Sequence, residues 1–86
     1  MQTQTINGSN YTTYKTDIKK QPYTILVVTG ENNYISISKD MHWRNRATLG
    51  KEFKTFSAAS QFYKSAEMKT ALMMIEIEFN RISSAN

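Results

Sequence analysis

The stretch that decides the fold reads YTILVVT (23–29), GENN (30–33) and YISISK (34–39). Two strand-like runs flank a polar turn, and the Gly and Asn residues of that turn tolerate the positive φ that tight turns require. Residues 25–28 are apolar on both faces, which is typical of a strand inside a sheet. The stretch therefore predicts a central β-hairpin around which the rest of the chain is arranged.

The second arm of this hairpin alternates apolar and polar side chains, and alternate side chains of a strand point to opposite faces. The apolar set of both arms, which we expect in the core, consists of Ile25, Val27, Ile35 and Ile37. The outward set of the second arm consists of Tyr34, Ser36 and Ser38. We expect this outward row to be available for contacts with a partner.

The N-terminal part predicts a second, weaker hairpin with strands at about residues 2–6 and 11–18, separated by NGSN (7–10). Both strands are rich in Thr and Tyr, so we expect a solvent-facing pair at the edge of the sheet. The segment KKQP (19–22) is interpreted as a connector, because Pro lacks a backbone N–H for the sheet ladder and restricts the residue before it.

Residues 40–50 break the periodicity and predict a loop, and residues 51–55 predict a short last strand. A helix then follows over about residues 56–82, capped by Thr55 or Ser57 and bent or broken near 64–66. Residues 75–79 also alternate as a strand would, but the high helix propensity of the Ala, Leu and Met residues before them favours a helix.

These elements predict one α+β domain over residues 1–86. Its antiparallel sheet of four to five strands comprises two N-terminal hairpins and a short strand, packed by one or two C-terminal helices. The composition agrees, because 40% of the 86 residues are hydrophobic and 21% are charged, as in a globular domain.

The composition also limits the chemistry and the location of the protein. Cysteine is absent, which excludes disulfides and thiolate metal sites and fits a reducing compartment. The N-terminus lacks the features of a signal peptide, and no apolar run approaches the roughly 20 residues that span a bilayer. We therefore expect a cytoplasmic protein without membrane contacts, whose net charge of +4 mildly favours anionic partners.

Candidate catalytic groups are sparse. His42 is the one histidine, and Asp40 could orient it only if the loop folded back. Glu76 and Glu78 are two residues apart, so on a helix their side chains point in different directions. The pair Gly50-Lys51 lacks the upstream glycine and the following Ser or Thr of a phosphate-binding loop. We expect no enzymatic activity, cofactor or metal ion.

Basic and aromatic residues are interleaved around the predicted loop. Cations follow phosphates and aromatic rings stack on bases, so this composition suits single-stranded nucleic acid. Arginine and tryptophan also suit a protein interface, and the alternative role of Trp43 is to close one end of the core. The candidate partner-binding residues are Tyr34, Ser36, Lys39, Trp43, Arg44, Arg46, Lys51 and Lys54.

Three methionines lie in the predicted helix. Met68 falls on the apolar stripe of the helix and is assigned to the core. Met73 and Met74 widen the apolar face beyond what a small sheet needs to cover, so they are candidates for a homodimer or partner contact.

The segments GKEF (50–53) and SAASQFYKS (57–65) resemble the strand-to-helix junction of small accessory proteins of phages and mobile elements. Some type I anti-CRISPR proteins share this layout, a strand meander closed by one or two helices. The resemblance implies an inhibitor or adaptor that occludes a surface of a nucleic-acid-handling complex, in the host cytoplasm if the chain is phage-encoded. It therefore implies a protein partner. The alternative is direct binding of single-stranded DNA or RNA by the sheet face and residues 39–54.

Overall fold

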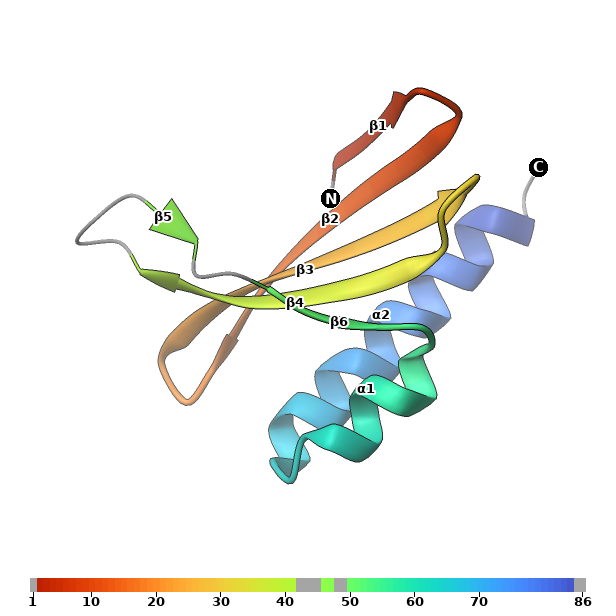
Figure 1. Cartoon of the computed structure of the whole chain (residues 1–86). Helices are drawn as coiled ribbons and strands as arrows, with labels where there is room; N and C mark the ends of the chain where they lie inside the picture. The colour runs from red at the N-terminus through yellow and green to blue at the C-terminus, as the bar shows by residue number, and fades with distance from the viewer. Residues whose placement is uncertain (1, 42–45, 48–49, 85–86) are drawn as a thin grey trace.

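The computed structural model describes residues 2–41, 46–47 and 50–84 of the chain. They form an antiparallel sheet with both helices on one of its faces (Figure 1). The strands are β1 (Gln2–Ile6), β2 (Ser9–Ile18), β3 (Gln21–Gly30), β4 (Tyr34–Met41), β5 (Arg46–Ala47) and β6 (Lys51–Phe53). The helices are α1 (Phe56–Phe62) and α2 (Ala66–Ser84). The predicted α+β class, with an antiparallel sheet packed by C-terminal helices, is confirmed.

Strands β1 to β4 form a meander in which each strand pairs with its neighbour in sequence. The far side of β4 is shared, because residues 35–37 pair with β6 and residues 40–41 pair with β5. The short strand β6 therefore takes the place predicted for the last strand, whereas β5 was not predicted.

The connection between β2 and β3 differs from the predicted connector. The turn contains only Lys19 and Lys20, with φ of 52° and 68°, since Gln21 already pairs with Ile18. Pro22 therefore lies inside β3. Ile18 and Gln21 form the hydrogen-bonded pair that closes the turn. The next pair, Asp17 and Pro22, exchanges no backbone hydrogen bonds, so the missing N–H of Pro22 is tolerated.

The predicted solvent-facing edge pair is wrong for β2. This strand pairs with β3 along its whole length and buries three side chains on the face toward the helices, because it forms one flank of the core. The edge position belongs to β1, whose residues 3–6 are exposed. The buried side chains of β2 on this face are Thr12, Tyr14 and Ile18.

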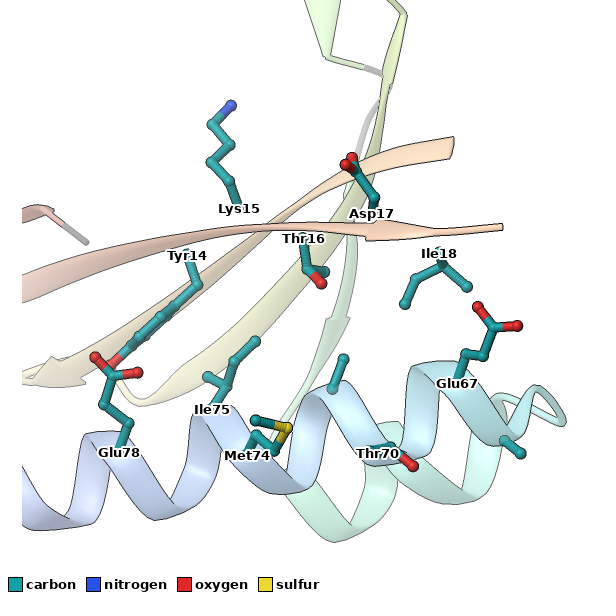
Figure 2. A pocket seen from close by; sticks show the side chains of 12 residues that line it. Tyr14, Lys15, Thr16, Asp17, Ile18, Glu67, Thr70, Met74, Ile75 and Glu78 are labelled. Carbon is teal, nitrogen blue, oxygen red and sulfur yellow. The ribbon is translucent and has the colours of Figure 1, made fainter. Parts of the chain in front are cut away.

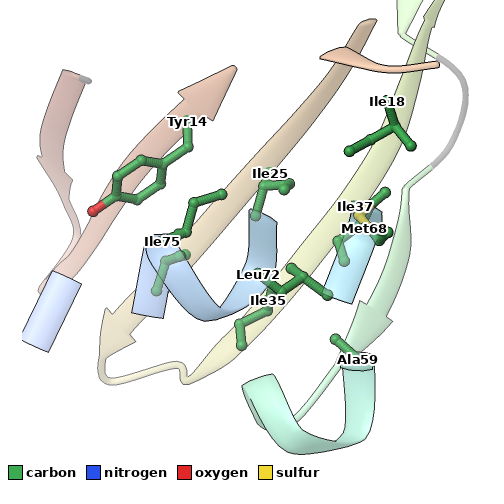
Figure 3. Close-up of a cluster of buried hydrophobic side chains, with 10 residues drawn as sticks. Tyr14, Ile18, Ile25, Ile35, Ile37, Ala59, Met68, Leu72 and Ile75 are labelled. Atoms are coloured by element: carbon green, nitrogen blue, oxygen red, sulfur yellow. The ribbon is translucent and has the colours of Figure 1, made fainter. Parts of the chain in front are cut away.

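The core lies between the sheet and the two helices (Figure 3). The four residues predicted from the central hairpin are at most 4% exposed, which confirms them as core. The helices contribute Ala59, Met68, Leu72 and Ile75. Partly buried aromatic side chains close the margins of this cluster, and they are Tyr23, Phe53, Phe56, Tyr63 and Phe79.

Two side-chain caps separate the helices. The Thr55 hydroxyl accepts a hydrogen bond from the Ala58 N–H at 3.0 Å, so it is Thr55 and not Ser57 that caps α1. Because residue 55 serves as this cap, the last strand ends at Phe53. The Ser65 hydroxyl accepts from the Met68 N–H at 3.2 Å at the start of α2, and the predicted break lies at residues 63–65.

Helix α2 includes residues 75–79, so these residues form the helix that the sequence favoured and not the alternative strand. Within the described ranges, neither helix is long and apolar enough to cross a membrane.

Candidate interaction surfaces

The structure divides the predicted partner-binding residues between the two faces of the sheet. Tyr34 and Ser36 lie on the open face, which the helices do not cover. Lys39 is exposed but belongs to the opposite face, because it shares the alternation of Ile35 and Ile37. Tyr34, Ser36 and Lys39, which were all predicted to bind a partner, therefore do not form one continuous surface.

Lys51 and Lys54 also lie away from the open face. Lys51 pairs with Ile37, and its Nζ lies 4.2 Å from the centroid of the Phe62 ring. A cation over an aromatic face is a stabilising contact, so this lysine is engaged with α1. Lys54 is exposed in the short connection between β6 and α1. Neither side chain joins Tyr34 in one patch.

Several predicted residues lie outside the part of the chain that the structure describes. They include Trp43, Arg44 and His42. Arg46 lies in β5, and its backbone pairs with that of Met41 in β4, but its side chain is not among those described. Partner binding by these residues, and the alternative that Trp43 closes the core, therefore stay predictions.

The open face of the sheet carries a phenol pair. Tyr11, Val28 and Tyr34 lie directly opposite one another on β2, β3 and β4, and Val28 is 1% exposed. Burial raises the pKa of the Tyr34 hydroxyl, and the neighbouring Tyr11 and Glu52 raise this pKa further. Ser36 also lies opposite Glu52. This part of the face therefore combines aromatic rings with a carboxylate.

At the other end of the open face, Asp40 ties three strands together. Its carboxylate accepts hydrogen bonds from Thr24 Oγ1 at 2.7 Å and from Lys15 Nζ at 3.4 Å. Its backbone carbonyl accepts from Gln21 Nε2 at 3.1 Å. Asp40 thus serves the packing of β2, β3 and β4.

The face of α2 turned away from the sheet is apolar. Met73 and Met74, predicted as contact residues, are 55% and 63% exposed, and Ile77 is 54% exposed. Ile77 was not predicted, although it follows the methionines by four and three residues, a spacing that puts all three on neighbouring positions of a helix. We call Met73, Met74 and Ile77 the outer face of α2.

The outer face continues to the end of the helix. Ile82 is 38% exposed because it lies beyond Phe79, which is packed against the core. A hollow of about 490 Å³ lies at this end of the helix. Its apolar lining comes from Met74, Ile77 and Ile82, and its charged lining from Glu78 and Arg81.

A groove of about 540 Å³ separates β2 from α2 (Figure 2). Tyr14, Thr16 and Ile18 point from β2 toward the helix, whereas Lys15 and Asp17 point away from it. The helix side of the groove includes Glu67, Ala71, Met74, Ile75 and Glu78.

The Tyr14 hydroxyl at one end of this groove is buried and has no hydrogen-bond partner among the described residues. Burial raises the pKa of this hydroxyl, and the nearby Glu78 carboxylate raises it further. At the other end, Glu67 Oε2 accepts from the Lys19 N–H at 3.3 Å. The groove therefore has an apolar middle and a carboxylate at each end.

No group of three or more His, Cys, Asp or Glu side chains that could hold a metal ion occurs in the described ranges. No family model, curated protein or solved structure matches the chain.

Proposed function

We propose that this chain is a non-catalytic binding module that docks on another protein through the outer face of α2. The observation that carries the proposal is the exposure of Met73, Met74 and Ile77 on a helix whose opposite side is already buried. Each Å² of apolar surface left in water costs about 25 cal/mol relative to burial, so a protein that covered this face would gain free energy.

The side chains of this face favour a partner with an apolar groove or helix. Methionine is flexible and adapts to irregular surfaces, while Glu78 and Arg81 at the margin supply charges of both signs. A helix that presents side chains at this spacing resembles the helix-in-groove mode of recognition.

Within this class, we place the chain among inhibitors or adaptors of the phage and mobile-element type, which occlude a surface of a nucleic-acid-handling complex. The resemblance of residues 50–65 and the small size of the chain support this assignment. It includes a cytoplasmic location, in the host cell if the chain is phage-encoded, and requires no cofactor.

The test is binding to purified host complexes that handle nucleic acid, measured by biolayer interferometry with wild type and Ile77→Glu. We expect the charge to weaken binding by about tenfold to a hundredfold, because it buries a carboxylate in the contact. The matched control is Gln4→Glu, which adds the same charge at an exposed position of β1, on the open face of the sheet and away from α2. Equal binding by both variants would contradict the use of this face.

A second candidate is direct binding of single-stranded DNA or RNA by the open face of the sheet. Tyr11 and Tyr34 beside Val28 favour it, because partly exposed aromatic rings on a sheet can stack on bases at about 1 to 3 kcal/mol each. Lys39 and Lys51 lie on the other face of the sheet, so they would not contact a nucleic acid bound to the open face.

A gel shift with a single-stranded oligonucleotide tests the second candidate. Binding should weaken steeply as salt rises and should decrease in Tyr34→Ala, Trp43→Ala and Arg44→Ala. The absence of a shift at low salt would contradict this candidate while leaving protein binding open.

A further inference from the structure

We propose that two copies of the chain join along the exposed edge of β2, about a twofold axis at Thr16, and so form one continuous sheet. This inference goes beyond the proposed function, because it assigns a second interface on β2 and leaves most of the outer face of α2 free.

The described residues of β1 cover only part of the outer edge of β2. They pair with residues 9–13 of β2, and the last of these pairs is Gln2 opposite Thr13. Residues 14–18 of β2 pair with β3 on one side, and no strand of the described ranges lies on their other side. A free strand edge is a template for pairing with another strand.

The turns fix which backbone groups point outward. Ile18 and Gln21 flank the two-residue turn at 19–20, so they form a hydrogen-bonded pair of the ladder. Bonded and non-bonded positions alternate along an antiparallel strand. Lys15 and Asp17 therefore direct their backbone N–H and C=O groups away from β3, toward the open edge.

This edge is complementary to itself. An antiparallel copy with Thr16 opposite its own counterpart puts Lys15 opposite Asp17 of the second copy, and Asp17 opposite Lys15. These are the positions whose backbone groups point outward, so each pair can exchange both of its N–H···O bonds. Each pair also joins opposite charges, which stabilises cross-strand neighbours. A patch that matches itself in this way is what a twofold dimer requires.

The groove beneath the edge supplies apolar surface for the same contact. Thr16 points into the groove toward the part of α2 that carries Thr70 and Met74 (Figure 2). In the paired arrangement, the two copies of α2 run antiparallel below the joined sheet, and Met74 of each lies near the axis. Met74 is 63% exposed in the single chain, so the pairing would bury it.

The ends of the groove also receive partners. Tyr14 lies opposite Ile18 of the second copy, so the turn 19–20 of that copy comes beside Tyr14 and Glu78. Two lysines there offset the negative charges of Glu78 and of Glu67 from the second copy, which the antiparallel helices bring to the same end. The contact is therefore balanced in charge as well as in backbone pairing.

Sedimentation velocity and amide hydrogen exchange over a concentration series test the proposal. We expect a species of twice the 9.9 kDa chain mass, with a dissociation constant on the order of micromolar for an interface of modest size. The amides of Lys15 and Asp17 should become protected as the dimer forms, whereas those of Thr16 and Ile18 should be protected throughout.

Variants separate this edge from the outer face of α2. Asp17→Pro removes an outward N–H without touching the β2–β3 ladder and should abolish the dimer. Asp17→Lys puts like charges opposite each other and should raise the dissociation constant by about tenfold, whereas the double variant Lys15→Asp/Asp17→Lys should restore it. Circular dichroism checks that each variant is folded, because Lys15 also contacts Asp40.

A chain that stays monomeric throughout the concentration series would overturn the proposal. It would also be overturned by a dimer that Asp17→Pro leaves intact and in which the amides of Lys15 and Asp17 exchange freely. Because Ile77→Glu lies outside the predicted seam, it should weaken binding to a host protein and leave the dimer intact, so the two proposals can fail separately.

Discussion

The two sides of α2 are built from the same kinds of residue but lie in opposite surroundings. Met68, Leu72 and Ile75 face the sheet and are at most 8% exposed. Met73 and Ile77 lie on the other side of the helix and are more than half exposed. The difference comes from the sheet, which covers one side of the helix only. Apolar composition alone therefore does not reveal which side of such a helix belongs to the core.

The largest effect should come from the inner side. Leu72→Ala removes a side chain that is 1% exposed and leaves a cavity, so we expect a loss of about 2–5 kcal/mol in the free energy of unfolding. Urea denaturation followed by circular dichroism measures it. A loss below about 1 kcal/mol would mean that the inner side is not tightly packed.

The cap at the start of α2 stabilises the helix as a whole, and therefore both of its sides. Ser65→Ala removes the acceptor of the Met68 N–H, so we expect a loss of about 1 kcal/mol. The same denaturation experiment measures it, and Ser65→Asp should retain most of the stability because a carboxylate also caps a helix.

The Tyr14 hydroxyl lies where β2 meets the flank of α2. Tyr14→Phe removes a buried hydroxyl that has no partner in the described ranges, so we expect the free energy of unfolding to rise by about 1 kcal/mol. Thermal unfolding at neutral pH measures it. A decrease in stability would show that the hydroxyl makes a contact that stabilises the fold.

The dependence of stability on pH gives an independent test of the same site. Burial raises the pKa of Tyr14 above its ordinary value of 10.0, so the neutral phenol is favoured in the folded state. Its contribution is fully present below about pH 10 and is lost as the pH rises through the raised pKa. We expect stability to fall above about pH 10, and to fall less steeply in Tyr14→Phe.

The smallest effect should come from the outer side. Met73→Ala changes a side chain that is 55% exposed, so we expect the free energy of unfolding to change by less than about 0.5 kcal/mol. Denaturation beside Leu72→Ala measures the contrast between neighbouring residues. A loss comparable to that of Leu72→Ala would remove the distinction between the two sides.

The sequence predicted the parts of the fold that depend on local pattern. The alternation around Ile35 and Ile37 and the apolar run of β3 identified the core of the sheet, and Thr55 was one of the two predicted caps. The turn at Lys19 and Lys20 was missed because lysine carries no signal for positive φ. That omission also hid the pairing of β2 with β3, and hence the burial of β2.

The candidate surfaces were predicted less well, because they depend on which faces remain open after packing. Met73 and Met74 were predicted from the width of the apolar face, and they are exposed. Lys39 was grouped with Tyr34 by proximity in sequence, although strand alternation puts the two on opposite faces. The groove beside β2 was not predicted, since it depends on how α2 packs beside the strand.

The order of the strands in the sheet has a consequence for how the chain folds. Because β1 to β4 pair with their sequence neighbours, most of the sheet can form by closing short loops, and such local contacts favour rapid folding. The residues that cover its apolar face come last, in α2. During synthesis from the N-terminus, the strands are therefore made before the helix that covers them. Until α2 has packed, Ile25 and Ile35 are exposed and can aggregate or bind chaperones.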